Sequence, residues 1–129
     1  MVMTDEQIVL TANQAFYRAF EKQDMEAMSS LWSKGTASVC IHPGRKAVKG
    51  WEAIRTSWEQ IFKATQYLEI ETQIISTEIN GDLAYVILTE NVMQIVGRRR
   101  LQATSMATNI YSRMANQWYL IHHHGSPII

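Results

Sequence analysis

Apolar residues recur every three or four positions in the first half of the chain and every second position in the other half. Near the N-terminus, a spacing of four predicts one stripe of an amphipathic helix, made of Ile8, Ala12, Phe16 and Phe20. Thr4 and Gln7 form a capping box at the start of this helix, which we expect to end about Lys22. The pattern therefore predicts helices first and strands afterwards.

Two further helices and one strand are predicted before the period changes. Asp24 can cap a short helix whose apolar side is formed by Met25, Met28, Leu31 and Trp32. A strand over 36–41 follows and stops at the sequence His42-Pro43-Gly44. After Gly50, a third helix presents an apolar stripe of Trp51, Ile54, Trp58, Ile61 and Phe62.

The chain from Tyr67 onward predicts an antiparallel meander. Residues 67–78 alternate apolar and polar side chains, and Asn80-Gly81 is typical of a hairpin turn. Strands over 83–96, 99–114 and 117–125 follow, separated by turns. Three helices before hairpin-linked strands predict an α+β domain in which the helices pack on one face of a bent antiparallel sheet.

The two rows of the strand over 83–96 decide where a cavity would lie. We expect one row to face the helices: Leu83, Tyr85, Ile87, Thr89, Asn91 and Met93. It would lie beside a row of the next strand: Ala103, Ser105, Ala107, Asn109 and Tyr111. The small residues of that row would leave space for an apolar pocket, with the amides of Asn91 and Asn109 as neutral hydrogen-bonding groups. A tightly packed core, with both amides bonded to backbone, is the alternative.

The opposite row of the same strand is predicted to lie on the outer face of the sheet. Its apolar residues, with one from the next strand, would form a patch for a second subunit: Val86, Leu88, Val92 and Ile110. Glu90 interrupts this row, and an unpaired carboxylate there would be costly. We expect it to pair with Arg99 or Arg113 or to meet the partner subunit. A functional carboxylate with a raised pKa is the alternative.

The composition narrows the class of protein. The chain has 129 residues, 47% of them hydrophobic and 19% charged, which predicts one domain over residues 1–129 with some surface buried against another subunit. Twelve basic and twelve acidic residues give a net charge of zero, so nucleic-acid binding is not expected. Cys40 is the single cysteine, which excludes an intrachain disulfide and a cysteine-based metal cluster. Without an apolar run of ~20 residues or a basic N-terminal region, no contact with a membrane is expected, and a cytoplasmic location is predicted.

The sequence motifs of several enzyme classes are absent. The chain has no GxGxxG, Walker loop, GxSxG, HExxH or CxxC pattern. Nucleotide-dependent chemistry and serine hydrolysis therefore have no support in the sequence, and no cofactor is expected.

Four short motifs in a fixed order resemble a known superfamily. They are Asp24-Met25-Glu26-Ala27, Val48-x-Gly50, Asn80-Gly81-Asp82 and the tail from Gln117 to Pro127. With the order of the elements, they make the whole chain similar to the nuclear transport factor 2-like superfamily. The similarity is greatest to SnoaL-like domains and to the association domain of calcium/calmodulin-dependent protein kinase II. The resemblance implies a cone-shaped, cystatin-like fold, which serves isomerases, cyclases, dehydratases and non-catalytic assembly domains.

Comparison with two branches of this superfamily removes two functions. Steroid isomerases have an Asp base where this chain has His42, and their oxyanion-hole Tyr and protonated Asp correspond to Phe16 and about Ala107. Without those two donors, steroid isomerisation is not expected. The cavity arginines of kinase association domains correspond to uncharged positions: Asn91, Asn109 and Gly125. A site that holds an anion by arginines is therefore not expected either.

Three consecutive histidines lie in the last predicted strand. His122 and His124 are expected to share one face with two apolar side chains, Trp118 and Leu120. The two could bind zinc only with a third ligand from elsewhere, such as His42 or Glu90. Hydrogen bonds across a subunit interface are the preferred interpretation, so no metal is predicted. The register of the superfamily implies that His123 faces the pocket.

His42 is the candidate catalytic residue, because it precedes a rigid proline and titrates near neutral pH; a loop histidine fixed by a turn is the alternative. The predicted pocket residues are mostly aromatic or amide side chains: Phe16, Trp32, Trp58, Tyr85, Asn91, Asn109, Tyr111 and His123. We therefore expect a small apolar or weakly polar ligand, with isomerase- or lyase-type proton transfer by His42. A non-catalytic, homo-oligomeric assembly module is the alternative, so the sequence leaves open whether the chain is an enzyme. A homodimer or a larger ring is the expected assembly.

Overall fold

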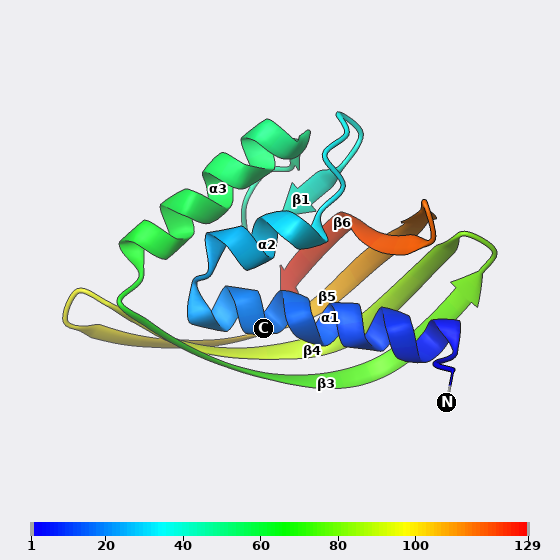
Figure 1. Ribbon diagram of the computed structural model, residues 1–129. Coiled ribbons are helices and arrows are strands. Elements are labelled where there is room, and N and C mark those ends of the chain that lie inside the picture. Colours follow the sequence, from blue (N-terminus) through cyan, green and yellow to red (C-terminus); the bar gives the residue numbers. More distant parts are fainter. Residues whose placement is uncertain (1, 129) are drawn as a thin grey trace.

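The computed structural model describes residues 2–128 and places three helices on one face of a six-stranded sheet (Figure 1). The elements in chain order are α1 Asp5–Lys22, α2 Met25–Leu31, β1 Val39–Ile41, β2 Val48–Lys49, α3 Trp51–Ala64, β3 Tyr67–Asn80, β4 Leu83–Val96, β5 Arg99–Met114 and β6 Gln117–Pro127. The predicted α+β class, with N-terminal helices on a curved antiparallel sheet, is confirmed.

The sheet has the strand order β2-β1-β6-β5-β4-β3, and its strands pair antiparallel except for β1 and β6, which are parallel. Its long strands bend, and the helices fill the concave side (Figure 1). The register shifts between Ile74 and Ser76 in β3, and again where Ile110 and Tyr111 of β5 pair with β6. Since a β-bulge bends its strand and increases the local twist, these irregularities help the sheet to curve around α1.

Helix α1 carries polar groups into the space between the helices and the sheet. It starts at a capping box, in which Thr4 and Gln7 each accept a hydrogen bond from the other's backbone N–H, and it stops at Gln23, which has a left-handed φ of 55°. Its buried residues are Val9, Asn13, Phe16, Tyr17 and Ala19. Asn13 and Tyr17 are polar, so this face of α1 brings hydrogen-bonding groups as well as apolar side chains into the core. Neither α1 nor any other helix of residues 2–128 is long and apolar enough to span a membrane.

Aromatic rings fill the space between the helices and the sheet. Phe16 is fully buried, and its ring centroid lies 5.6 Å from that of Trp58 and 6.4 Å from that of Trp32. The ring of His42 packs edge-on against Trp58, with the centroids 4.8 Å apart. Edge-to-face aromatic pairs contribute about 0.5–1.5 kcal/mol beyond their buried area. This cluster fixes α3 over the sheet and holds His42 beside it.

The row of β4 that faces the helices is the opposite of the predicted one. Four consecutive inward residues are each at most 2% exposed: Ala84, Val86, Leu88 and Glu90. Tyr85 is 39% exposed, and Asn91 is exposed on the outer face. The prediction was wrong because both rows of β4 are largely apolar, and the charge of Glu90 marked its own row as the solvated one.

The bulge between β5 and β6 decides which histidines face the helices. Trp118 and Leu120 are buried, and the next residue of β6 has no partner in the register. After it, His123 is the inward residue at 1% exposed, while His122 and His124 lie on the outer face. The predicted shared face of His122, His124, Trp118 and Leu120 is therefore wrong, since one inserted residue inverts the alternation of a strand.

Gly125 lies where β6 passes under the loop after β1, without room for a side chain. A Cβ on Gly125 would lie 2.9 Å from Cγ of Pro43 and 3.5 Å from Oε1 of Glu90. We expect Gly125→Ala to lower the free energy of unfolding by about 1–3 kcal/mol in urea denaturation, because the rigid proline ring must move. Gly35→Ala is the matched control: its Cβ would meet its nearest atom at 3.6 Å, so a loss below about 0.5 kcal/mol is expected. Equal losses in the two variants would contradict this account of the loop.

Candidate functional site

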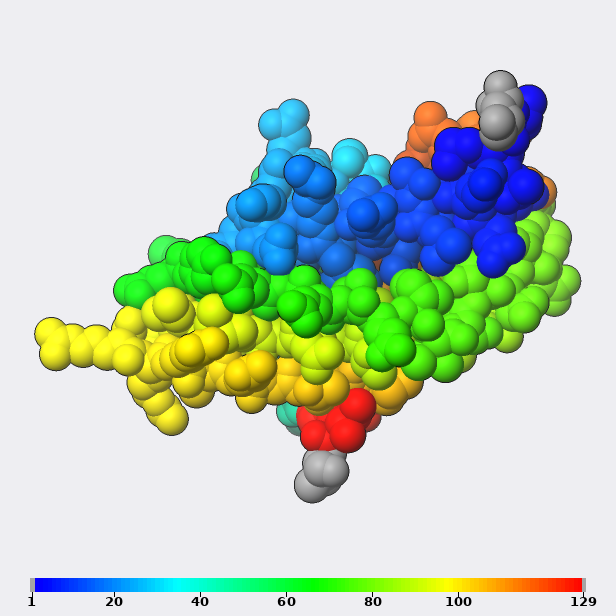
Figure 2. All heavy atoms as spheres, turned by 90° about the horizontal axis from the view of Figure 1, so that it is seen from below, coloured from blue at the N-terminus to red at the C-terminus, as the bar shows by residue number. Residues whose placement is uncertain are grey.

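A cavity of about 680 Å³ opens between α3, the β4–β5 hairpin and the loop after β1. Figure 1 shows α3 above this end of the sheet, and Figure 2 shows the tip of the hairpin, in yellow, projecting beyond the rest of the molecule. The apolar part of the wall is Phe20, Pro43, Ile61, Ala64, Val92, Val96, Ala103 and Pro127. Polar side chains also reach it, among them His42, Glu90, Ser105 and His123. An apolar cavity with a few convergent polar groups is typical of a small-molecule site.

A hydrogen-bond network lies behind the inner end of this cavity. Asn109 on β5 donates from Nδ2 to Oδ1 of Asn13 at 2.9 Å and to the hydroxyl of Tyr17 at 3.1 Å. Tyr111 donates its hydroxyl to the same Asn13 oxygen at 2.9 Å. Since both amide hydrogens of Asn109 are used, its Oδ1 can only accept, and it accepts from Nδ1 of His123. His123 therefore carries its hydrogen on Nδ1, which leaves a lone pair on Nε2.

Glu90 joins this network from β4 and is 2% exposed. The Tyr17 hydroxyl donates to its Oε2, while Oε1 makes no hydrogen bond within residues 2–128. Burial raises the pKa of Glu90 from 4.5 to about 7, and the hydrogen bond from Tyr17 offsets part of that rise. Burial and the adjacent carboxyl raise the pKa of Tyr17 well above 10, so its phenol stays a donor. Near neutral pH, the Glu90 carboxyl is thus divided between its protonated and ionised forms.

His42 follows β1 and lines the same cavity. Its Nε2 lies 3.0 Å from the hydroxyl of Ser57, which donates its hydrogen to the carbonyl of Ile54 at 2.7 Å. The Ser57 oxygen therefore accepts from Nε2–H, and Sγ of Cys40, 3.7 Å from the same nitrogen, is a second, weak acceptor. The lone pair of His42 is on Nδ1. Burial, and to a lesser degree the charge of Arg45, lowers the pKa of His42 from 6.5 to about 4. At pH 7 this imidazole is a neutral base.

Three titratable side chains meet at the inner end of the cavity. Nε2 of His123 lies 4.0 Å from Oε2 of Glu90, and the ring centroids of His42 and His123 are 6.5 Å apart. Burial, helped by the other histidines, lowers the pKa of His123 from 6.5 to about 3. Two neutral imidazoles thus lie near a carboxyl that holds its proton up to neutral pH. Pairs of groups whose pKa values are pushed apart in this way suit acid–base chemistry.

The structure divides the predicted site residues into four groups. His42 and His123 lie on the cavity wall. Asn109 and Tyr111 belong to the network behind it, and three predicted pocket residues are fully buried in the aromatic core: Phe16, Trp32 and Trp58. Tyr85 and Asn91 lie on the outer face of the sheet, so their predicted place in the pocket is wrong.

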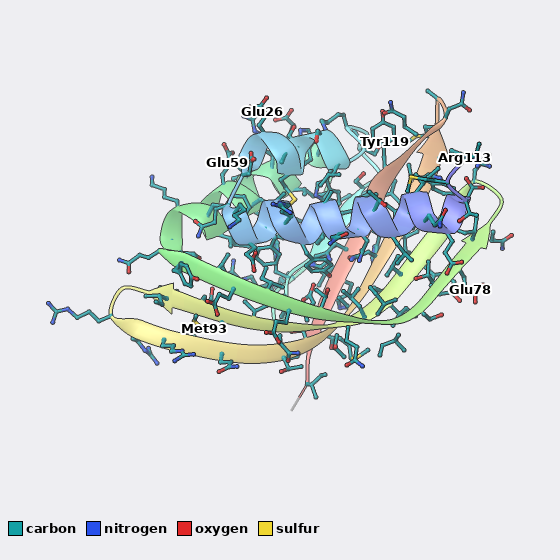
Figure 3. All side chains as sticks on the ribbon, turned by 60° about the horizontal axis from the view of Figure 1, so that its bottom comes forward. Glu26, Glu59, Glu78, Met93, Arg113 and Tyr119 are labelled. Atoms are coloured by element: carbon teal, nitrogen blue, oxygen red, sulfur yellow. The ribbon has the colours of Figure 1, made fainter. Side chains whose placement is uncertain are left out.

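The expected ion pair of Glu90 with Arg99 or Arg113 is also wrong. Its hydrogen-bond partner is a tyrosine, whereas Arg113 forms ion pairs with Asp5 at 3.1 Å and with Asp82 at 2.9 Å. Figure 3 shows Arg113 at the end of the sheet that lies beside the first turn of α1. A lone carboxylate on an otherwise apolar row was the signal in the sequence, and the alternative interpretation, a carboxylate with a raised pKa, agrees with the structure.

Two members of the network, Tyr17 and Asn13, had no place in the sequence-based site. The resemblance to steroid isomerases placed the missing phenol at Phe16, but the neighbouring Tyr17 brings a hydroxyl to Glu90. Tyr17 and Glu90 thus bring a phenol and a carboxyl with a raised pKa together, although the phenol donates to Glu90 and Tyr17 is not part of the cavity wall. The four-residue spacing of Asn13 and Tyr17 puts both on one face of α1, which is a signal that the apolar stripe concealed.

Neither a metal site nor a thiolate extends this cluster within residues 2–128, although Sγ of Cys40 lies 3.7 Å from Nε2 of His42. No group of three or more His, Cys, Asp or Glu side chains within residues 2–128 is arranged to hold a metal ion. The ring centroids of His122 and His124 are 6.2 Å apart. Cys40 is buried, and burial raises the pKa of its thiol far above the usual range, so a thiolate does not form there near neutral pH.

Comparisons with known proteins bear on the family and the fold. The family model of the SnoaL-like domain matches residues 9–129. A Streptomyces avermitilis protein of the NTF2-like family, proposed to be a dehydratase, is 31% identical; the match covers 97% of this chain and 96% of that chain, with a TM-score of 0.90. A proposed calcium/calmodulin-dependent protein kinase type II association domain from Thiobacillus denitrificans is 28% identical, over 93% and 94% of the two chains, with a TM-score of 0.83.

More distant relatives agree in fold alone. A ketosteroid isomerase-like protein from Erwinia carotovora atroseptica has a TM-score of 0.87 over 99% of both chains, at 17% identity. A comparison with curated proteins returns no match. The activity must therefore be argued from the side chains of this chain.

The raised pKa of Glu90 predicts a stability that depends on pH. The pKa of Glu90 rises from 4.5 to about 7 on folding. The contribution of Glu90 to the free energy of unfolding is therefore complete below pH 4.5 and is lost as the pH rises through 7. Relative to Glu90→Gln, which cannot ionise, the wild type should lose about 2–3 kcal/mol of unfolding free energy between about pH 5 and about pH 8. Urea unfolding of both proteins at both pH values measures this difference.

The difference between the two proteins cancels the contribution of the histidines. His42 and His123 have lowered pKa values, so their contribution to the free energy of unfolding is present above pH 6.5 and is lost as the pH falls. That effect runs opposite to the effect of Glu90 and is common to both proteins. A stability difference that stays constant with pH would contradict the raised pKa of Glu90.

Proposed function

Since the chain belongs to the SnoaL-like domain family of the nuclear transport factor 2-like superfamily, we propose that its cavity binds a small, mostly apolar molecule and transfers protons on it. The family expected from the sequence motifs is thereby confirmed, whereas the reaction is the proposal. The observation that carries it is the meeting of His42, His123 and Glu90 in one apolar-walled cavity. The reaction is of the lyase or isomerase type.

His42 acts as the base in this proposal, and Glu90 acts as the acid. The lone pair on Nδ1 of His42 takes a proton from a carbon of the ligand, and the electrons of that C–H bond form a C=C bond. Glu90 is protonated on Oε1, because Oε2 accepts from Tyr17, and it gives this proton to a hydroxyl of the ligand. The C–O bond breaks and water leaves. That water can return the proton of His42 to Glu90, which restores both groups.

The same two groups could instead move a double bond, by removing a proton from one carbon and returning it to another. Dehydration is the better-supported alternative, because the Streptomyces relative is itself proposed to be a dehydratase and aligns along almost the whole chain. General acid–base groups contribute about 10²–10⁴-fold to such reactions.

Turnover is tested by incubating the protein with a small-molecule extract and following the mixture by mass spectrometry. We expect one component to decline while a product lighter by one water, or an isomer of equal mass, accumulates. His42→Ala should slow this conversion by at least about 100-fold. His124→Ala is the matched control, since His124 is exposed on the outer face, and it should leave the rate unchanged. Unchanged turnover in His42→Ala would dismiss His42 as the base.

A second candidate function, a structural assembly module, has one supporting observation. The outer face of the sheet carries partly exposed apolar side chains, among them Tyr85, Ile87, Met106, Ile110 and Tyr119. Ile110 alone remains from the predicted patch, because Val86 and Leu88 are in the core and Val92 lines the cavity. The Thiobacillus relative is a proposed association domain, which also supports an assembly role. We propose that the chain forms a homodimer through this face, whether it acts as an enzyme or as an assembly module.

Light scattering on the purified protein tests the assembly. We expect the mass of a dimer, and Ile110→Glu should give the mass of a monomer because a charge replaces an apolar contact. Gln102→Glu is the control, since Gln102 is already exposed on β5. A wild-type monomer would contradict the proposed dimer. A ring larger than a dimer, with no turnover, would favour the assembly module over the enzyme.

A further inference from the structure

The hydrogen bonds around the cavity determine what a ligand finds at its inner end. Nδ1–H of His123 is used on Asn109, Nε2–H of His42 is used on Ser57, and Oε2 of Glu90 is used by Tyr17. Three atoms are left over: Nε2 of His123, Nδ1 of His42 and Oε1 of Glu90. All three carry lone pairs, and all three residues line the cavity.

The remaining polar groups of the wall do not change this picture. Thr65 donates its hydroxyl hydrogen to the carbonyl of Ile61 at 2.7 Å, so its oxygen is one more acceptor. Ser105 is buried and can donate or accept. Arg45 is a donor, but it is exposed on the loop after β1, where water screens its charge. Gln60 and Gln94 can also donate, but Gln60 is exposed on α3 and Gln94 is half-buried near the tip of the β4–β5 hairpin. The inner end of the cavity is therefore rich in acceptors and poor in donors.

We propose that the polar end of the ligand is a hydroxyl group, which the lone pairs of His42, His123 and Glu90 select over a carboxylate or a ketone. This inference rests on the proposed function and narrows it to alcohols with an apolar body. Above pH 7, where Glu90 is ionised, a carboxylate or a ketone would leave these lone pairs unpaired in a desolvated site, because either group only accepts hydrogen bonds. An ammonium group would lose its hydration among the apolar side chains of the wall.

A hydroxyl also suits the two forms of Glu90. When the carboxyl is ionised, the ligand hydroxyl donates to it or to an imidazole. When Oε1 carries the proton, the ligand oxygen accepts that proton's hydrogen bond while its own hydrogen goes to a histidine nitrogen. The alcohol is thus held by both forms of Glu90. When Glu90 is protonated, the alcohol oxygen lies against the carboxyl that would protonate it as water leaves.

Four naphthalene probes that differ in one substituent test this selection by isothermal titration calorimetry at about pH 8. In the wild type, 2-naphthylmethanol should bind about 3- to 10-fold more tightly than 2-methylnaphthalene, which measures the apolar cavity alone. The ketone 2-acetylnaphthalene should gain nothing over 2-methylnaphthalene. 2-Naphthoate should bind at least about tenfold more weakly, because its charge is desolvated without donors.

The Glu90→Gln variant is expected to weaken this preference for a hydroxyl, because it replaces an acceptor by a donor. The Tyr17 hydroxyl can donate to the amide oxygen of this variant, which turns the amide NH₂ toward the cavity as a donor. We expect the preference for 2-naphthylmethanol over 2-naphthoate to fall by at least about tenfold, with the affinity for 2-methylnaphthalene unchanged.

The outcomes separate the two proposals. If the hydrocarbon binds but 2-naphthoate or the ketone binds as tightly as the alcohol, or if Glu90→Gln leaves the preference unchanged, the hydroxyl assignment is overturned and the cavity stands. If none of the four probes binds, or if Ala103→Trp on the cavity wall does not weaken binding of 2-methylnaphthalene, the proposed small-molecule site itself is overturned, and the hydroxyl assignment with it.

Discussion

A carboxyl group buried between helices and sheet is the constraint on which the rest of the site depends. Moving an unpaired carboxylate out of water is costly, so Glu90 must either pair or hold a proton, and this structure gives it both a hydrogen bond and a raised pKa. The bond comes from Tyr17 on α1, which is itself held by Asn109 on β5. A chain of directed hydrogen bonds thus connects α1, β4 and β5 at the inner end of the cavity.

Burial acts in opposite directions on the groups that surround the cavity. It raises the pKa of Glu90, because the carboxylate is the charged form, and it lowers the pKa of His42 and His123, because the imidazolium is the charged form. The same burial therefore provides a protonated acid, Glu90, and two neutral bases, His42 and His123, over one range of pH. Neither a metal ion nor an ion pair is needed to explain these shifts.

Much of the fold followed from local patterns. The capping box at Thr4 and the period of four along α1 marked the first helix, and Asn80-Gly81 marked the hairpin between β3 and β4. His42 could be singled out because a proline follows it and fixes the loop after β1. These features depend on neighbours in the sequence, so the sequence alone reveals them.

What the sequence concealed depends on neighbours in space. The inward row of β4 could not be chosen, because both rows are apolar and the deciding contact, from Tyr17 to Glu90, joins residues 73 positions apart. The bulge opposite Ile110 could not be seen either, yet it turns His123 toward the helices. The register of the superfamily implied that orientation of His123 where strand alternation gave no reason to choose it.

The titration of the Glu90 carboxyl tests the central claim most directly. In protein labelled with ¹³C at the glutamate carboxyl carbons, the resonance that disappears in Glu90→Gln should titrate with a midpoint of about 7. Removing the hydrogen bond in Tyr17→Phe should move that midpoint higher still, because the bond from Tyr17 lowers the pKa. A midpoint near the ordinary value of 4.5 would mean that this carboxyl is solvated, and the acid of the proposed site would be lost.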